Sequence, residues 1–262
     1  MSDLWDLSGR RALVTGASAG GLGQHFALSL ARAGADVAVL DRPQEAERLA
    51  ETSAAVRAIG VRSESVHADV TVEEELESAI DLAEHGLGGG VDIVVSAAGV
   101  MLREAAVEST PGAWRRVVDV NLTGTWLTTR VVARRLIASG AGWGRFVTVS
   151  TQYAGIAGPL PESSYYASKA GVANLTRSLA SEWAPHGITV NCLAPGAFFP
   201  TRMTAPLADD PGRLESITRR TMLGRLGDAE RDLDGPLVFL ASDAAAYVTG
   251  AVLHVDGGWS AW

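Results

Sequence analysis

The chain has 262 residues, of which 47% are hydrophobic and 29 are glycine, and its formal net charge is −8. This length suits one large domain, and the acidic balance argues against a nucleic acid partner and against an anionic membrane surface. A single cysteine, Cys192, excludes an internal disulfide and a cysteine-based metal cluster, while the five histidines are scattered without ligand spacing. With no signal-peptide pattern and no apolar run as long as a membrane helix, we expect a cytoplasmic protein without a metal ion.

Short apolar runs typical of strands alternate along the chain with longer runs of helical periodicity. The expected strands are 11–15, 36–41, 61–68, 91–96, 145–150, 188–193 and 251–255. The first expected helix begins near Leu22, and the others cover 43–59, 72–84, 110–138, 164–183 and 229–240. Strands such as IVVS show no polar alternation, which is typical of strands buried on both faces. The pattern predicts an α/β fold with a doubly wound parallel sheet and helices on both faces, in a single domain over residues 1–262.

One segment departs from this rhythm. Residues 194–224 begin APGAFFPTRMTAPLADDPGRL and are rich in proline, glycine and alanine. This composition predicts an irregular excursion from the sheet, because long connections without regular structure are commonly functional loops. We expect the segment to act as a substrate lid.

The sequence LVTGASAGGLGQHF, residues 13–26, places several glycines between a strand end and a helix start. Free N–H groups at a helix start bind phosphate, and glycine lets the phosphate approach closely. The G-x-G-x-x-G pattern is absent, because Phe26 stands where the third glycine would be. T-G-x-x-x-G-x-G fits if the loop has one extra residue, or if Gly20 is the second glycine and the helix begins late. The alternative to a cofactor site is an ordinary turn. The expected contacts are Gly16, Ser18, Gly20, Gly21, Leu22 and Gly23.

The next strand ends in VAVLDRP, which places Asp41 at about the usual distance after the glycine loop. A carboxylate there would accept hydrogen bonds from the adenosine ribose and repel a 2′-phosphate, so it favours NAD over NADP. Arg42 could attract that phosphate, and Asp41 could instead be a solvated acid at the strand end. Asp69, in HADVT, suits the adenine edge of the site or a helix cap.

The sequence SSYYASKAGVANLTRSLASEW contains the clearest catalytic pattern. Tyr165 and Lys169 are four residues apart and therefore share one face of a helix. A free tyrosine has a pKa of about 10 and is a poor base at neutral pH. A neighbouring ammonium group stabilises the phenolate and lowers that pKa, which would make Tyr165 a usable acid or base.

At this point the chain resembles the short-chain dehydrogenase/reductase family over nearly its whole length. The further matches are VDVNLTGTW with Asn121, GRFVTVST before the tyrosine, ITVNCLAPG with Pro195 and Gly196, and the tail FLASDAAAYVTGAVLHVDGG. The resemblance implies a Rossmann-type sheet of seven strands. It also implies an oxidoreductase that transfers hydride between a nicotinamide cofactor and a ketone or secondary alcohol.

The resemblance implies a role for each catalytic residue. Tyr165 would be the acid or base, while Lys169 would lower its pKa and bind the nicotinamide ribose. Asn121 would expose a main-chain carbonyl that holds a water linked to Lys169. Thr151 aligns with the usual catalytic serine, but Ser150 stays open as the alternative. Cofactor contacts are implied at Asp69, Val70, Ala98, Gly99, Tyr165, Lys169, Pro195, Gly196 and Thr201.

Four segments depart from the family pattern. The glycine loop, the stretch after Ser150 and PGAFFPTRM each look one residue long, and we expect these extra residues to reshape the pocket rim. SAAG, residues 96–99, replaces two asparagines that the family usually has. Ser96 and Ala97 cannot make the same side-chain hydrogen bonds, which places local stability in question more than chemistry.

The residues expected around the substrate are mostly apolar: Met101, Gln152, Tyr153, Leu160, Phe198 and Phe199. They favour a small or medium neutral ketone or secondary alcohol, although they could instead pack the lid or a subunit interface. Arg103 or Arg202 could receive an acid. We expect a homotetramer, with Trp259 and Trp262 buried between chains or lining the pocket of a neighbouring chain. The rival functions are a catalytically silent nucleotide-binding sensor or scaffold of the same fold, and a cofactor-retaining epimerase or dehydratase.

Overall fold

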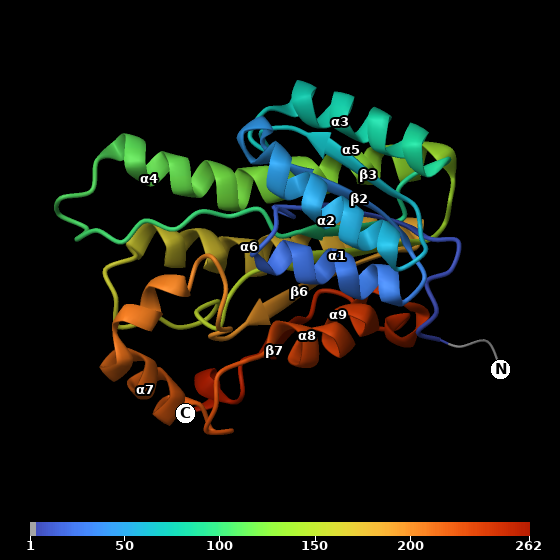
Figure 1. Ribbon diagram of the computed structural model, residues 1–262. Helices are drawn as coiled ribbons and strands as arrows, with labels where there is room; N and C mark the ends of the chain where they lie inside the picture. Colours follow the sequence, from blue (N-terminus) through green and yellow to red (C-terminus); the bar gives the residue numbers. More distant parts are fainter. Residues whose placement is uncertain (1–3) are drawn as a thin grey trace.

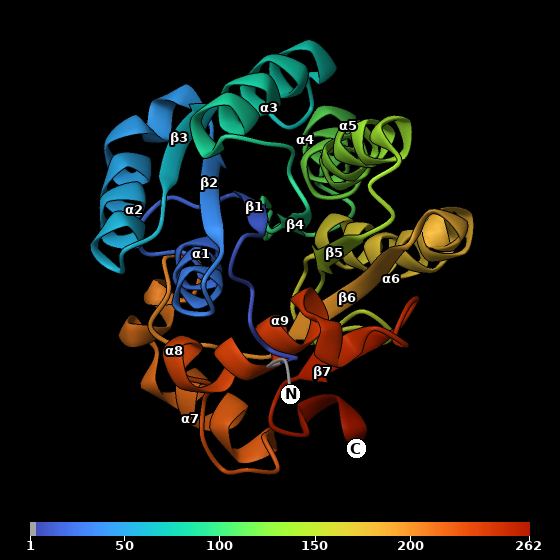
Figure 2. The same cartoon turned by 90° about the vertical axis from the view of Figure 1, so that its right-hand side faces the viewer.

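The structure, a computed structural model, describes residues 4–262, with the backbone alone for Pro206. Within this range the centre is a sheet of seven strands in the order β3-β2-β1-β4-β5-β6-β7, with all neighbours parallel (Figure 2). The predicted doubly wound α/β fold is therefore confirmed. The strands are β1 Arg11–Thr15, β2 Asp36–Asp41, β3 Ser63–His67, β4 Ile93–Ser96, β5 Gly144–Val149, β6 Ile188–Pro195 and β7 Val252–Val255.

Helices cover both faces of the sheet (Figure 1). Apolar side chains of α1, α2 and α9 form one core with the sheet, and those of α3, α5 and α6 form the other. Each fully buried leucine or phenylalanine in these cores, such as Leu30 and Phe146, contributes about 1.5–3 kcal/mol. The helices are α1 Leu22–Arg32, α2 Ala46–Ala58, α3 Glu73–Leu87, α4 Pro111–Val118, α5 Gly124–Ser139, α6 Ser163–Trp183, α7 Pro211–Arg220, α8 Ala229–Asp232 and α9 Asp234–Ala241.

The strand order places a switch point between β1 and β4. The helix after β1 packs on one face of the sheet, and the helices after β4 reach the other face. The loops that leave these two strands therefore diverge and open a crevice beyond the carboxyl ends of the strands. Ligands of open α/β sheets bind at this position.

Two parts of the chain differ from the sequence prediction. The helix expected over 110–138 is interrupted by a turn of π-helix at Asp119–Thr123, which separates α4 from α5. Residues 194–224 are less irregular than expected: β6 continues to Pro195, and the segment contains α7. Pro211 at the first position of α7 and the Asp210 side chain, which caps Arg213 N, explain why a helix begins there.

Within residues 4–262, no helix is both long and apolar enough to cross a membrane. Nor do three or more histidine, cysteine, aspartate or glutamate side chains gather there in an arrangement that could hold a metal ion.

Candidate active site

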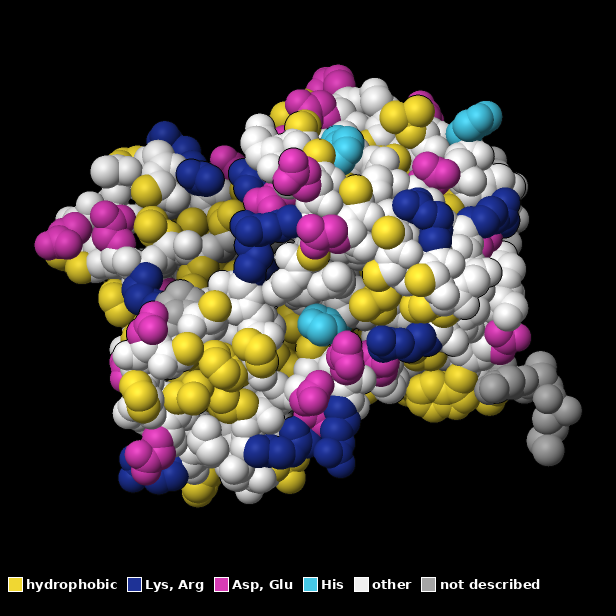
Figure 3. Space-filling model, in the orientation of Figure 1, with side chains coloured by type: hydrophobic (Ala, Val, Ile, Leu, Met, Phe, Trp, Pro, Cys, Tyr) yellow, Lys and Arg dark blue, Asp and Glu magenta, His cyan; other side chains and the backbone are white. Residues whose placement is uncertain are grey.

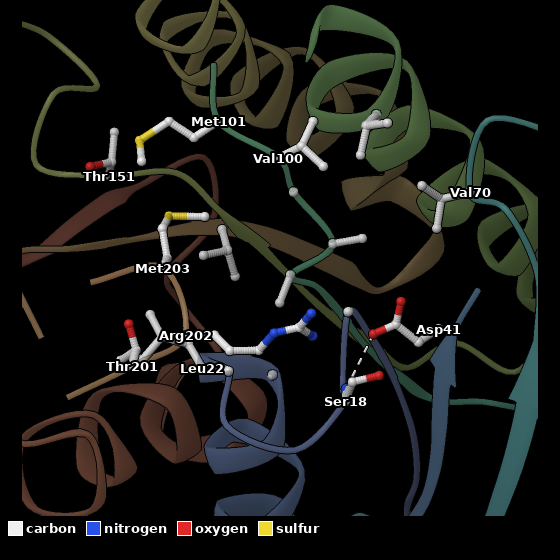
Figure 4. Close-up of a pocket in the computed structure, with 18 of the residues that line it drawn as sticks. Ser18, Leu22, Asp41, Val70, Val100, Met101, Thr151, Thr201, Arg202 and Met203 are labelled. Atoms are coloured by element: carbon white, nitrogen blue, oxygen red, sulfur yellow. Dashed lines mark hydrogen bonds between the residues drawn. The ribbon is translucent and has the colours of Figure 1, made fainter. Parts of the chain in front are cut away.

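A cavity of about 720 Å³ lies beyond the carboxyl ends of β1, β2, β4, β5 and β6. Asp41 and Ser18 lie at one end, and Thr151 and Met101 lie at the other (Figure 4). The cavity brings together most of the residues that the sequence predicted for the site, from segments far apart in the chain. Those residues are Gly16, Ser18, Gly21, Leu22, Gly23, Asp41, Asp69, Val70, Ala98, Gly99, Met101, Ser150, Thr151, Tyr165, Lys169, Pro195, Gly196, Phe198 and Thr201.

The glycine loop is shaped by close approaches of the main chain. A Cβ atom at Gly23 would lie 2.2 Å from the Gly16 carbonyl oxygen, and one at Gly16 would lie 2.7 Å from Ala98 Cα. Gly16 also has a φ of +66°. These two positions therefore require glycine, and they correspond to the first and last glycines of the family motif.

The two middle glycines differ from each other. Gly20 has a φ of +86°, whereas Gly21 is an extended N-cap just before α1, whose first residue is Leu22. A Cβ atom at Gly21 would make only ordinary contacts. Gly20 does not line the cavity, and its N–H donates to the Gln24 side chain. Gly20 is thus the bulging residue of the loop, and Gly21 is the glycine next to the helix start.

The loop and the end of β2 fit a dinucleotide. The Ser18 hydroxyl is buried and has no hydrogen-bond partner among the described residues, although it stands in the cavity wall. Ser18 N and Arg42 N donate to the two carboxylate oxygens of Asp41, which hold this acid at the cavity. Open N–H groups at the start of α1, an unpaired hydroxyl and an oriented carboxylate are the groups that a diphosphate and a ribose require.

Tyr165 lies at the inner end of the cavity and is 7% exposed. Burial raises the pKa of its phenol to about 12, and a hydrogen bond with the Thr151 side chain lowers that pKa only in part. The sequence predicted that Lys169 lowers the pKa of Tyr165, but Lys169 is not among the groups that shift this pKa in the structure. The Lys169 ammonium nitrogen lies 6.0 Å from the tyrosine ring centre and donates instead to the Val149 carbonyl at 2.8 Å.

Lys169 is buried, and among the described residues no carboxylate forms an ion pair with it. Burial lowers the pKa of its ammonium group to about 8. A Cβ atom placed on Gly99 would lie 3.5 Å from Lys169 Nζ. The lysine therefore reaches the cavity wall beside the segment that follows β4. A side chain placed this way can bind a ribose hydroxyl and can lose a proton near neutral pH.

The two candidate hydroxyls have different partners. Ser150 Oγ donates to the main-chain oxygen of Lys169 at 2.7 Å, which ties β5 to α6. The Thr151 side chain lies close enough to Tyr165 to lower the pKa of the phenol. Ser150 and Thr151 both line the cavity, but Ser150 is not among the groups that shift this pKa. The contacts favour Thr151 as the hydroxyl that meets the substrate.

Asn121 lies behind the cavity wall, fully buried in the π-helical turn. Its amide accepts a hydrogen bond from Val100 N at 2.8 Å and donates to Val100 O at 2.9 Å and to Ser168 Oγ at 3.0 Å. These contacts fix the segment after β4 against α6. These side-chain hydrogen bonds explain why an asparagine stands in the middle of the helical stretch. The Asn121 carbonyl accepts a hydrogen bond from the Thr125 hydroxyl.

The altered segment at residues 96–99 keeps its place through other contacts. Ala98 N donates to the Thr15 hydroxyl at 3.2 Å, which ties the segment to the end of β1. The Ser96 hydroxyl is buried without a hydrogen-bond partner among residues 4–262. Ala98 and Gly99 line the cavity through a stretch with little side chain. This fits a contact made by the main chain.

Of the six residues predicted around the substrate, only Met101 and Phe198 line the cavity. Tyr153 instead packs against Tyr166, at 4.9 Å between ring centres, and against Trp259, at 5.1 Å. Three more residues, Gln152, Leu160 and Phe199, are also absent from the cavity wall. Val100, Val149, Met203 and Thr204 line it as well. Met203 is another residue that the sequence indicated for the substrate region, and Thr204 lies in the same expected lid.

The prediction that Trp259 is buried between chains is wrong. Trp259 is 3% exposed within its own chain, where Arg220 of α7 lies 3.8 Å from its ring centre. Trp262 is 68% exposed, and its indole N–H donates to the Arg220 carbonyl. The tail therefore holds the end of α7. Figure 3 shows hydrophobic side chains gathered over this part of the molecule, beside the hollow below α4.

The chain also matches known proteins. The family model described as enoyl-(acyl carrier protein) reductase matches residues 16–260. The 2-dehydro-3-deoxy-D-gluconate 5-dehydrogenase of Dickeya dadantii (strain 3937) is 38% identical over 259 residues, which are 98% of either chain. The cis-4-hydroxycyclohexanecarboxylate dehydrogenase of Sinomonas cyclohexanicum is 41% identical over 253 residues, covering 96% of this chain and 97% of that one. A gluconate 5-dehydrogenase from Burkholderia cenocepacia J2315, solved with NADP and tartrate, has a TM-score of 0.91 at 35% identity and covers 99% of this chain and 98% of that chain.

The sheet, the glycine loop and the buried tyrosine–lysine pair define a dinucleotide-dependent oxidoreductase. The chain belongs to the short-chain dehydrogenase/reductase family. It is an enzyme that uses a nicotinamide cofactor and acts on CH–OH groups. The preference for NAD stays a prediction, because the solved relative holds NADP.

Proposed function

We propose that the protein interconverts a secondary alcohol and a ketone, with NAD as cofactor and Tyr165 as acid and base. The observation that carries this proposal is the pairing of Thr151 with Tyr165 at the inner end of a cavity whose other end is the glycine loop. When bound, the cofactor would supply or accept the hydride. The rest of the chemistry falls to the side chains of this chain.

In this mechanism, the Thr151 and Tyr165 hydroxyls bind the substrate oxygen. During oxidation Tyr165 accepts the alcohol proton, and during reduction it donates a proton to the carbonyl oxygen. Lys169 binds a ribose hydroxyl and passes the proton on, helped by its low pKa. Asn121 fixes the π turn. We propose that the main-chain carbonyl of Asn121 holds the relay water. The apolar wall excludes other water from the reacting atoms.

The proposed preference for NAD rests on Asp41. Its carboxylate stands at the cavity, held by Ser18 N and Arg42 N, where it would accept ribose hydrogen bonds and repel a 2′-phosphate. The test is a fluorescence titration with NADH and with NADPH, in the wild type and in Asp41→Ala. Tighter binding of NADH that Asp41→Ala weakens is the expected result. A preference for NADPH in the wild type would contradict it.

For the substrate we propose a small or medium molecule with a mostly apolar body, such as an alicyclic alcohol. The cavity wall includes the apolar side chains of Met101, Val149, Phe198 and Met203, and Met101 and Met203 lie on the same side as Thr151 (Figure 4). A relative at 41% identity is named for an alicyclic hydroxy acid, which combines such a body with a carboxylate. Arg103, half exposed and paired with the buried Glu162 at 2.8 Å, is a candidate cation for that acid. The test compares turnover of cyclohexanol, cis-4-hydroxycyclohexanecarboxylate and gluconate.

A sugar acid is the second candidate substrate, and the relatives named for gluconate and its deoxy-keto derivative favour it. The apolar wall argues against it, because several hydroxyl groups would lose water without enough polar partners. Turnover of gluconate with no turnover of the two alicyclic compounds would overturn our choice. If the wild type binds NADH but oxidises none of a broad panel of alcohols, a catalytically silent nucleotide sensor becomes the better description.

We further propose that the protein is a homotetramer. Trp114 of α4 and Trp126 of α5 are each 39% exposed, and both lie on the long helical stretch that carries Asn121. Large aromatic side chains at a surface favour burial against a partner. Sedimentation of the purified protein gives the mass directly, and a monomeric species at micromolar concentration would contradict the proposal.

A further inference from the structure

An ion pair joins Arg202 to Glu45 at the dinucleotide cavity, although the two residues are far apart in the sequence. Arg202 directly follows Thr201 in the segment after β6, and Glu45 ends the short helix Pro43–Glu45 that follows β2. Arg202 Nη1 donates to Glu45 Oε2 at 2.9 Å and Nη2 donates to Oε1 at 3.1 Å. Both residues line the cavity. In Figure 4 the guanidinium group points from the lid segment toward Asp41 and Ser18.

A second contact ties Arg202 to the glycine loop. Its main-chain N–H donates to the Gly20 carbonyl at 2.8 Å, and its side-chain Cγ lies 3.7 Å from where a Cβ at Gly20 would be. Gly20 is the bulging residue of the long glycine loop, and Arg202 lies in the long segment after Pro195 and Gly196. The two lengthened segments therefore meet, and they place one guanidinium group at the phosphate-binding part of the cavity.

The charges around this guanidinium suit an exchange of partners. Glu45 is its carboxylate partner, Arg48 lies 3.6 Å from the same Glu45 oxygen that accepts from Nη1, and Arg42 also lines the cavity. The Arg202 side chain is 50% exposed, so solvent screens its attraction to Glu45 and can reach the guanidinium group. A phosphate offers the guanidinium fork the same two-oxygen geometry as a carboxylate and carries more charge. A bound phosphate would therefore replace Glu45 at little cost.

We propose that Arg202 is a phosphate ligand carried by the lid, which exchanges Glu45 for a phosphate of the dinucleotide when the cofactor binds. In the absence of cofactor, Glu45 holds Arg202 beside the glycine loop. Once released from Glu45, Arg202 would hold the lid segment over a bound dinucleotide, because the neighbouring Thr201 lines the same cavity. This inference rests on the proposed binding of a nicotinamide dinucleotide. Both the diphosphate and a 2′-phosphate present the required chemistry.

The experiment measures dissociation constants for NADH and NADPH by fluorescence titration in six proteins: the wild type, Arg202→Gln, Arg202→Lys, Glu45→Gln, the double variant Glu45→Gln/Arg202→Gln, and a control. The control is Arg225→Gln. Arg225 lies in the segment after α7, makes a similar two-point pair with Asp232 and does not line the cavity. It therefore reports what loss of an arginine–carboxylate pair in this part of the chain does by itself.

We expect Arg202→Gln to weaken dinucleotide binding about tenfold, as loss of a charge-assisted hydrogen bond does. Arg202→Lys should recover part of the loss, because it keeps the charge without the fork. Glu45→Gln should tighten binding relative to the wild type. The double variant should bind no more tightly than Arg202→Gln alone. Equal losses for NADH and NADPH assign Arg202 to the diphosphate, while a loss for NADPH alone assigns it to the 2′-phosphate.

The result that overturns the inference is unchanged binding in Arg202→Gln, or an equal loss in Arg225→Gln. Weaker binding in Glu45→Gln would also overturn it, since the ion pair would then support the site as a fixed strut. If the wild type binds neither NADH nor NADPH, the proposed function has failed instead. The two failures are therefore distinguishable.

Discussion

The Ser150 hydroxyl donates a 2.7 Å hydrogen bond to the main-chain oxygen of Lys169, and this contact separates the roles of two adjacent hydroxyl residues. It fixes the end of β5 against α6 and so helps place the lysine. The Thr151 side chain, one residue later, lies close enough to Tyr165 to lower the pKa of its phenol. We therefore propose that the first hydroxyl is structural and that the second meets the substrate.

This division predicts different losses at the two positions. Thr151→Val keeps the shape of the side chain but removes the hydroxyl, and we expect kcat to fall about 100-fold with little change in stability. Ser150→Ala should lower the free energy of unfolding by about 1 kcal/mol. Thr151→Ser, as control, should keep most activity. A 100-fold loss in Ser150→Ala with an active Thr151→Val would reverse the assignment.

The buried phenol predicts a pH dependence. Burial raises the pKa of Tyr165 to about 12, so the neutral acid dominates at neutral pH. We expect the rate of alcohol oxidation to rise with pH from 7 to 9, while the rate of ketone reduction stays nearly constant, because the phenol is protonated throughout this range. Tyr165→Phe should lower both about 1,000-fold and remove the dependence. Steady-state rates in both directions, measured on the enzyme across this range, check the prediction; a flat profile for oxidation contradicts it.

The low pKa of Lys169 predicts how stability changes with pH. The folded state lowers this pKa to about 8 from an ordinary value of 10.5. Between these values the unfolded chain binds more protons than the folded chain, so this residue makes the free energy of unfolding rise with pH. The rise is at most about 1.4 kcal/mol per pH unit. Denaturant titrations from pH 7 to 10 at fixed protein concentration should show it as the difference between wild type and Lys169→Met. A difference that falls with pH would contradict the prediction.

The glycine loop predicts a graded set of alanine substitutions. Gly23→Ala and Gly16→Ala force a Cβ against main-chain atoms at 2.2 Å and 2.7 Å, so each should destabilise the fold by about 2 kcal/mol or more and abolish cofactor binding. Gly20→Ala makes only ordinary contacts with the Arg202 side chain but has a positive φ, and should cost about 1 kcal/mol. Gly21→Ala is the matched control with no clash. Thermal unfolding and NADH titration give this order; an intolerant Gly21 would show that the helix start is misplaced.

The sequence alone determined the sheet and much of the site. Apolar runs and glycine turns predicted β1 and β2 at their observed bounds, because a strand buried on both faces has few residue types open to it. Tyr165 and Lys169 were placed on one helix face by their spacing, which is a local property of the chain. The first and last glycines of the loop were also identified locally.

Only the tertiary structure decided what depends on contacts between distant segments. It separated Ser150 from Thr151, moved Tyr153 from the cavity into a cluster with Trp259, and buried that tryptophan within its own chain. It also brought Arg202 to Glu45, 157 positions apart. Spacing along the chain cannot supply these relations. They arise where loops from several strand ends converge, and the side-chain partners there are set by packing across the sheet edge rather than by the period of any one element.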